Sequence, residues 1–376
     1  MEGVLVLTGA TNGLGLSCAR ALARAGTSGC GISHLVLACR GVEAARKVAD
    51  SIQSAAFPRD RIVVLDQPCD LASLASVRAY AAALRAWLGD RKVSVLTNNA
   101  GIGGSPTFTR SADGFEVIWA TNHLGHFLLT LLLLPAFAPS GGRIINVASE
   151  VHDIKGNKIP MPDPEEEWPA TTAEYDEVLA RGRPINGENT RDAGQRYYTR
   201  SKLCNVILTH ELARRLSGAA PRECAEATAS KLAAVAGARS CSLPAAAKTK
   251  VVSFNPGLML DGTFVSASQG AFIGGLAWLL QPVLSLTPLG KVLRSNAISG
   301  PVLARVSLPG APALGGLPEA GAADATAAYF DGERLHAASA FSRSAEVATR
   351  SQQELWEHSL RWAGVTEAEL KDAGFA

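Results

Sequence analysis

Thr8-Gly-Ala-Thr-Asn-Gly-Leu-Gly15 is a glycine-rich segment that joins a short apolar run to a helical pattern. The run Gly3–Thr8 is typical of a strand buried on both faces, and Leu16–Ala25 predicts a helix. Glycines in such a loop let the backbone turn tightly and approach a pyrophosphate, which the N-terminus of the helix then faces. The segment therefore predicts a dinucleotide site formed by Thr8, Gly9, Thr11, Asn12, Gly13, Leu14 and Gly15.

Further apolar runs predict the rest of a layered α/β fold. Strands are expected at 34–40, 61–65, 93–97, 143–149 and 251–254, and helices at 72–89, from Thr121 onward and at 195–216. Alternating strands and helices favour a doubly wound parallel sheet of the Rossmann type, with helices on both faces. We expect one domain over residues 1–376, interrupted by insertions.

The segments outside this alternation predict those insertions. Residues 150–197 are polar and rich in proline, which predicts an excursion over the sheet edge or a mobile substrate loop. We expect an Ala-rich surface insertion at 218–249, substrate-covering helices at 258–300, a low-complexity loop at 309–325 and a final amphipathic helix at 343–363. The apolar stretch 271–286 is too short and interrupted to span a membrane. It predicts a surface helix over an apolar pocket or one that contacts a bilayer interface.

Composition narrows the classes of function. With 47% hydrophobic and 19% charged residues and a net charge of +2, the chain is globular and gives no reason to expect a nucleic-acid partner. Its seven cysteines show no C-x-x-C spacing, which favours a reducing compartment, cytoplasmic or plastid-like, over a disulfide framework. No targeting peptide is expected ahead of the first motif. His123 and His126 have no carboxylate or thiol placed to complete a metal site, so no metal is expected.

Residues at the carboxyl ends of the other strands predict further cofactor contacts, because open α/β sheets bind ligands at that edge. Arg40 ends the second strand and suits the 2′-phosphate of NADP(H), unless it is an ordinary solvated arginine. Asp70 and Leu71 are placed to lie against the adenine. The segment Asn98-Asn-Ala-Gly101 and the turn after the sixth strand add Asn98, Ala100, Gly101, Pro256 and Gly257.

A tyrosine and a lysine stand four residues apart in the predicted helix 195–216. At that spacing Tyr198 and Lys202 lie on one helical face. A phenol is a poor acid or base at neutral pH unless a nearby cation stabilises its phenolate, and the lysine supplies that cation. Proton transfer to a carbonyl oxygen, coupled to hydride transfer, suits the pair. Tyr197 has no lysine at this spacing and is expected to line a pocket or pack.

The ordered set T-G-x-x-x-G-x-G, N-N-A-G, N-H-x-G-H-F, a strand-end serine and Y-x-x-x-K resembles the short-chain dehydrogenase/reductase family, over roughly residues 3–216 and 250–300. The resemblance implies a catalytic tetrad. Tyr198 is then the proton donor or acceptor, and Lys202 lowers its pKa and holds the nicotinamide ribose. Ser149 bonds the substrate oxygen, and Asn122 anchors a proton-relay water.

Two branches of that family look most similar. Leu-Ala-Cys-Arg40, Asn122-His-Leu-Gly-His-Phe127 and Ser201-Lys-Leu-Cys-Asn205 are similar to retinol dehydrogenase-like enzymes and to light-dependent protochlorophyllide reductases. The long gap before Tyr198, Cys204 and the tail Ser339–Trp356 favour the second branch. That branch usually has N-A-A where this chain has Asn99-Ala-Gly101, and a cysteine at Leu258. The P-G-x-x-x-T pattern also slips, so that Asp261 takes its last position and Thr263 is the nearest threonine for the cofactor.

The expected function is hydride transfer between NADP(H) and a carbonyl or alcohol of a lipophilic, retinoid- or aldehyde-like substrate. One alternative is light-dependent reduction of protochlorophyllide. Another is a non-catalytic cofactor-binding protein on the same fold. A peripheral membrane contact and a homo-oligomer both stay open as partners.

Overall fold

The computed structural model describes residues 3–26, 31–103, 108–153, 155, 161–165, 168–169, 171–182, 191–218, 248–259, 293–308, 327–332, 334–336, 338–339, 341–344 and 347–375. Thr263, the stretch 219–247, the stretch 260–292 and the loop 309–325 lie outside these residues. The predictions made for them therefore stay predictions.

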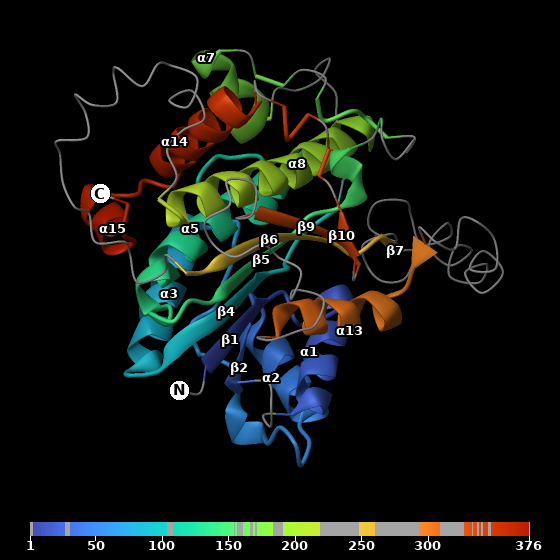
Figure 1. Ribbon diagram of the computed structural model, residues 1–376, viewed down its shortest axis with the longest axis vertical. Helices are drawn as coiled ribbons and strands as arrows, with labels where there is room; N and C mark the ends of the chain where they lie inside the picture. Colours follow the sequence, from blue (N-terminus) through green and yellow to red (C-terminus); the bar gives the residue numbers. More distant parts are fainter. Residues whose placement is uncertain are drawn as a thin grey trace.

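An eight-stranded sheet runs through the middle of the molecule, in the order β10-β9-β6-β5-β4-β1-β2-β3 (Figure 1). Every neighbouring pair is parallel except β10 with β9. The predicted doubly wound α/β fold is confirmed. The strands are β1 (Gly3–Thr8), β2 (Ile32–Ala38), β3 (Ile62–Val63), β4 (Lys92–Asn98), β5 (Arg143–Val147), β6 (Lys250–Asn255), β9 (Ala327–Asp331) and β10 (Arg334–His336).

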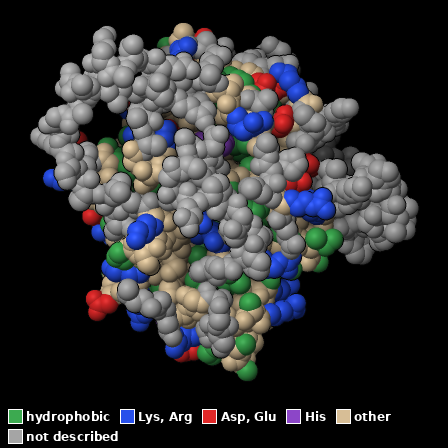
Figure 2. Space-filling model, in the orientation of Figure 1, with side chains coloured by type: hydrophobic (Ala, Val, Ile, Leu, Met, Phe, Trp, Pro, Cys, Tyr) green, Lys and Arg blue, Asp and Glu red, His purple; other side chains and the backbone are tan. Residues whose placement is uncertain are grey.

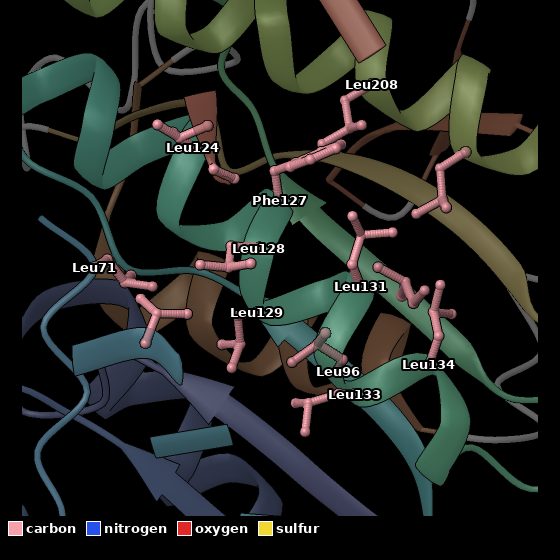
Figure 3. Packing of buried hydrophobic residues seen from close by; sticks show 14 of the residues in the cluster. Leu71, Leu96, Leu124, Phe127, Leu128, Leu129, Leu131, Leu133, Leu134 and Leu208 are labelled. Carbon is pink, nitrogen blue, oxygen red and sulfur yellow. The ribbon is translucent and has the colours of Figure 1, made fainter. Parts of the chain in front are cut away.

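Helices cover both faces of the sheet because side chains alternate along each strand. From β1, Leu5 and Leu7 enter one core with α1 (Gly13–Ala25), α2 (Val42–Ile52) and α13 (Asn296–Ser307). Val4 and Val6 enter the other core, under α3 (Leu74–Leu88), α5 (Gly125–Leu133), α8 (Arg191–Leu216) and α14 (Gln352–Trp362). Figure 3 shows Phe127, Leu128 and Leu131 of α5 at the centre of this second core.

The helix at the centre of the second core is continuous but changes its winding along its length. It begins as α4 (Val117–Trp119), passes through a π-helical turn, η2 (Ala120–Leu124), and continues as α5. Among the described residues, Val117–Ala136 is the one helical stretch long and apolar enough to cross a membrane, with a mean hydropathy of 1.5. Because 83% of it is buried inside the protein, this stretch has the environment of a core helix.

Several predicted boundaries need correction. The third strand is only Ile62–Val63, and the final helix begins as a π-helical turn, η9 (Val347–Ser351), that leads into α14. Residues 296–300 begin α13, which packs on α1, and their predicted role in covering the substrate stays a prediction. The two helices approach each other so closely that a side chain on Gly300 would overlap Ser17. The strands β9 and β10 and the last helix, α15 (Glu367–Asp372), were not predicted.

The helix α14 and the turn η9 before it lie over the described part of the 150–197 excursion. That part includes α7 (Thr172–Glu174) and the π-helical turn η5 (Tyr175–Ala180), which lie beside α14 in Figure 1. The Tyr175 ring stacks on His358 with centroids 4.8 Å apart, and Trp168 donates its Nε1–H to Ser351 Oγ at 3.2 Å. Asp176 accepts hydrogen bonds from Arg361 and Trp362.

Surface charge and cysteine state are unremarkable for a globular chain. On the face shown in Figure 2, Lys and Arg side chains are scattered among other described residues. Four cysteines within the described residues are buried and free: Cys18, Cys39, Cys69 and Cys204.

Candidate active site

The glycine loop after β1 is fixed to the segment after β4 by side-chain bonds. Thr8 Oγ1 accepts the backbone N–H groups of Asn99 and Ala100, both at 2.9 Å. In return, Asn99 Nδ2 donates to the carbonyls of Thr8 at 2.8 Å and Gly9 at 3.3 Å. These bonds make one rigid edge of the two predicted cofactor segments.

Glycines let the backbone segments of this edge pack closely. Gly9 has a φ of 69°, and a side chain there would lie 2.7 Å from Ala100 Cα. A side chain on Gly15 would overlap Gly9 O and come within 2.5 Å of Asn99 Nδ2. Asn12 precedes α1 without capping it through its side chain. The first amides of α1 are therefore available to an anion such as a pyrophosphate.

Asn98 and Asn99 face opposite sides of the sheet, as consecutive strand residues do. Asn98 Nδ2 donates to Thr130 Oγ1 at 3.0 Å and to Asn146 Oδ1 at 2.9 Å, inside the core beneath α5. The Asn98 side chain is therefore turned into the core, and the predicted cofactor contact of Asn98 stays a prediction for its backbone. Asn99, which was left out of the prediction, holds the loop instead.

The three residues predicted to bind the adenosine end of the cofactor have different environments. Arg40 follows β2 and is exposed. Asp70 Oδ1 accepts the Ala72 N–H at 3.0 Å. The Leu71 side chain is buried in the second core, where Figure 3 shows it beside α5, to the left of Leu128. A side chain on Gly125 would overlap Leu71 O, so α5 begins directly against this segment. Only the backbone of Leu71 is left to meet an adenine.

The predicted catalytic side chains meet where β5 ends. Lys202 Nζ donates to Val147 O at 2.9 Å and lies 5.6 Å from the centre of the Tyr198 ring. Tyr198 is hydrogen-bonded to Ser149. Burial raises the pKa of Tyr198, which the bond to Ser149 partly offsets. Burial also lowers the pKa of Lys202 to about 8.

Asn122 lies in the π-helical turn and joins both halves of the site. Its Oδ1 accepts the Ile102 N–H at 2.9 Å, and its Nδ2 donates to Ile102 O and to Ser201 Oγ, both at 3.0 Å. A side chain on Gly101 would lie 3.2 Å from Asn122 Oδ1 and 3.7 Å from Lys202 Nζ. Asn122 therefore fixes the loop after Gly101 beside the catalytic lysine.

The turn after β6 is tied to the segment that carries Ser149. Asn255 Oδ1 accepts the N–H groups of Glu150 at 3.1 Å and Gly257 at 2.9 Å. Pro256 O accepts a bond from Ser299 Oγ at 2.6 Å. The structure thus places the predicted Pro256-Gly257 turn next to the catalytic group.

Sequence reasoning missed Asn99, Glu150, His152 and Asn255. Each stands at a strand end, one to three residues from a motif residue, and that position was the available signal. Glu150 is buried, which raises the pKa of its carboxyl to about 7. It lies close enough to Tyr198 for its charge to raise the pKa of the phenol.

His123 and His126 bond to protein groups of different elements. His126 lies 2.9 Å from Thr8 Oγ1 through Nε2 and 3.1 Å from Asn122 O through Nδ1. His123 Nε2 lies 3.2 Å from Ser359 Oγ on α14. Among the described residues, no group of three metal-ligating side chains is present. Burial lowers the pKa of His123 to about 3 and that of His126 to about 4, so both are neutral at pH 7.

Comparison with known proteins identifies the family. Residues 3–160 match the model of the short chain dehydrogenases. Human retinol dehydrogenase 13 is 30% identical over 373 residues, which cover 98% of this chain and 86% of that protein. The chain belongs to the short-chain dehydrogenase family. The resemblance drawn from its motifs is confirmed at the level of the family.

Other relatives of this short-chain dehydrogenase match over a shorter region. Human retinol dehydrogenase 11 is 37% identical over 217 residues, 57% of each chain. The protochlorophyllide reductase of Daucus carota is 33% identical over 231 residues, 57% of this chain and 52% of that one. The matched region thus spans little more than half the length of these two relatives. A solved structure, an uncharacterized protein from Mycobacterium paratuberculosis, shares the fold with a TM-score of 0.54 at 23% identity, over 96% of this chain and 94% of that one.

Proposed function

We propose that this short-chain dehydrogenase transfers a hydride between NADP(H) and a carbonyl or alcohol of a lipophilic, retinoid- or aldehyde-like substrate. The observation that carries the proposal is the assembly of Tyr198, Lys202 and Ser149 at the end of β5. The loop that would hold the cofactor fits it, because the Asn12 side chain does not cap α1 and the first amides of this helix can bind an anion such as a pyrophosphate. The name of retinol dehydrogenase 13, which matches 98% of this chain, favours a retinoid-like substrate.

The three side chains divide the proton chemistry between them. When bound, NADPH supplies the hydride. Tyr198 donates its phenolic proton to the carbonyl oxygen, and Ser149 donates a hydrogen bond to the same oxygen. The Lys202 ammonium offsets the negative charge left on the phenolate. Because burial lowers the pKa of Lys202 to about 8, this charge is lost as the pH rises above that value.

Replacing the phenol tests this assignment. The Tyr198→Phe variant should lose about 10²- to 10⁴-fold in kcat for NADPH oxidation with retinal or aliphatic aldehydes, because one proton donor is removed. Its affinity for NADPH, measured by fluorescence titration, should stay close to that of the wild type. Tyr197→Phe is the matched control and should keep its rate, since Tyr197 packs against Phe108 at 5.7 Å. Unchanged turnover by pure Tyr198→Phe enzyme would overturn the assignment.

The choice of NADP(H) rests on Arg40, which is exposed at the end of β2. An arginine there suits a 2′-phosphate. NADPH should therefore raise the melting temperature more than NADH at equal concentration, and Arg40→Ala should abolish that difference. Arg46→Ala is the control, because Arg46 is paired with Glu43 and Asp66. Equal stabilisation of the wild type by both cofactors would contradict the choice.

A second candidate is light-dependent reduction of protochlorophyllide. It is favoured by the excursion held under α14 and by the match to the Daucus carota reductase. The protein, NADPH and protochlorophyllide would be mixed in the dark and then illuminated. A shift of the red absorption band only after illumination would favour this candidate, and no shift would end it.

A further inference from the structure

His152 stands three residues after Ser149, at the end of the short turn η4 (Glu150–His152), and its side chain is 2% exposed. Its Nδ1 lies 2.6 Å from Ser149 O, and its Nε2 lies 3.2 Å from the backbone nitrogen of Ser339. A carbonyl oxygen only accepts hydrogen bonds and a backbone N–H only donates them. Nδ1 therefore carries the proton and Nε2 the lone pair, which is one tautomer of the neutral ring.

The partner of Nε2 is itself fixed. Ser339 Oγ accepts the Ser342 N–H at 3.1 Å, and Ser342 Oγ donates to Ser339 O at 2.9 Å. Phe341, between them, packs edge-on against Trp168 at 5.9 Å. The His152 ring also lies 4.8 Å from the Tyr329 ring of β9. The imidazole is thus held between the catalytic segment, the seventh parallel strand and the C-terminal segment.

We propose that His152 is a positioning residue that holds the backbone of Ser149, and with it the hydroxyl bonded to Tyr198, only while its ring is neutral. A second ring proton would place an N–H opposite the Ser339 N–H. That clash between two donors would push the ring from its site and move the Ser149 carbonyl with it. The inference rests on the proposed function, in which Ser149 orients the substrate oxygen.

Burial and the neighbouring groups together set the pKa of the His152 ring. Burial is the largest influence and lowers the pKa of His152, while the bond to Ser149 and the charge of Asp153 raise it. The titratable and charged groups around the ring come from its own turn, from β9, from β8 (Leu293–Arg294) and from the C-terminal segment: Glu150, Asp153, Tyr329, Asp331, Arg294 and Arg343. The ring is therefore neutral at pH 7 and gains its second proton below the ordinary histidine range.

Two substitutions separate charge from shape. His152→Gln supplies both a donor and an acceptor but does not ionise. It should keep a kcat near that of the wild type at pH 7.5, and its kcat should fall less than that of the wild type on the acid side. His152→Ala supplies neither and should lose on the order of 10- to 100-fold in kcat, as expected for a displaced catalytic group. The KM for NADPH should stay unchanged in both, because the glycine loop is not touched.

A neighbouring charge gives the sign of the effect. Asp153→Asn removes a carboxylate that raises the pKa of His152, so the acid midpoint of kcat should move to lower pH. Glu150 titrates in a nearby range, since burial raises its pKa to about 7. It is present in the wild type and in His152→Gln alike, so the difference between their pH profiles belongs to His152. A pH profile of kcat that is the same in His152→Gln as in the wild type, or an unchanged kcat in His152→Ala, would overturn the proposal.

Nuclear magnetic resonance tests the ring without turnover. The chain has seven histidines, so ¹⁵N-histidine labelling gives few signals, and the one missing in His152→Gln belongs to His152. The expected spectrum at pH 7 is that of a neutral ring with its proton on Nδ1, titrating at the acid midpoint of kcat. A ring that is charged at pH 7, or protonated on Nε2, would contradict the proposal. If the wild type turns over no carbonyl, the proposed function fails, while this spectrum still decides the state of His152.

Discussion

On the side predicted to bind the cofactor, called the cofactor side, the loop 8–15 and the segment 98–101 hold each other through Thr8 and Asn99. On the side predicted to bind the substrate, called the substrate side, the excursion around Tyr175 is held by side chains of α14 near the other end of the chain. Each cofactor segment is recognisable alone, because glycines and strand-end amides have a fixed geometric purpose there. The aromatic residues of the substrate side can be assigned a role only when both members of each ring pair are known. The contrast teaches that the first side is encoded in short motifs and the second in contacts between distant segments.

Trp356→Ala should have the largest effect and should act on the substrate side. The indole is 2% exposed and packs edge-on against Phe127 at 5.2 Å and Phe375 at 5.3 Å. Loss of such a side chain costs about 3–5 kcal/mol of unfolding free energy, measurable by urea denaturation. Trp87→Ala, on the half-buried face of α3, is the control and should cost clearly less. Equal losses would remove the distinction between a core ring and a surface ring.

Gly15→Ala should act on the cofactor side. The new methyl group would overlap Gly9 O and displace the loop. We expect a loss of about 100-fold in NADPH affinity, which is about 3 kcal/mol, by isothermal titration. Gly41→Ala is matched to it, because its methyl group would lie 3.6 Å from the nearest atom, Ala44 Cβ. If both variants bind NADPH equally well, close backbone packing is not what limits the cofactor side.

His123 and His126 report on the two sides from one helix, since His123 reaches α14 and His126 reaches β1. Burial depresses the pKa of both in the folded protein, to about 3 and about 4. As the pH falls below 6.5, these two histidines bind protons in the unfolded chain but stay neutral in the folded chain, so the free energy of unfolding decreases. At pH 5 each histidine should cost about 2 kcal/mol relative to pH 8.

His123→Gln and His126→Gln should each remove one such contribution from the pH dependence of urea unfolding. Only His126→Gln should also weaken NADPH binding, because Thr8 would lose its partner. A loss of NADPH affinity in His123→Gln as well would show that the two sides are coupled through the helix.

Asp176→Asn should have the smallest effect. The carboxylate pairs with Arg361 at 2.9 Å, but both side chains are substantially exposed, 40% and 55%. Exposed pairs contribute about 0.2–1 kcal/mol, and the loss should shrink at high salt. The control is Asp66→Asn on the cofactor side, where the carboxylate is 93% exposed. A loss of unfolding free energy above that range would mean that Asp176 is needed to hold the excursion against α14.

The same contrast explains what the sequence predicted. The glycines of the loop, Tyr198, Lys202 and the parallel sheet follow from local patterns, and the structure has them in those places. Asn98 and Asn99 were exchanged because the pattern does not say at which residue β4 ends, and one residue reverses the face. The strand β9 was missed because Ala327–Asp331 is short and lacks β-branched residues.

Contacts of the other kind leave no local trace in the sequence. Nothing near His152 indicates that its ring meets Ser339, and nothing near Tyr175 indicates His358. Such pairs become visible only after the chain has folded. The tail was noticed in the sequence for its resemblance to one branch, but its contact with the excursion was not.

The π-helical turn at Ala120–Leu124 has a consequence for how this helix tolerates insertions and deletions. A π-turn is one extra residue accommodated by a helix. Because a π-turn takes up one residue more than an α-helical turn, deleting one of its residues would restore a regular α-helix and leave the segments before and after it in nearly the same orientation. Glu116 would still cap α4 through the amides of Ile118 and Trp119, and His126 would still face Thr8. The same deletion within α5 would instead turn the two parts of the helix by about 100° relative to each other, so this helix should tolerate a deletion better at the π-turn than in α5.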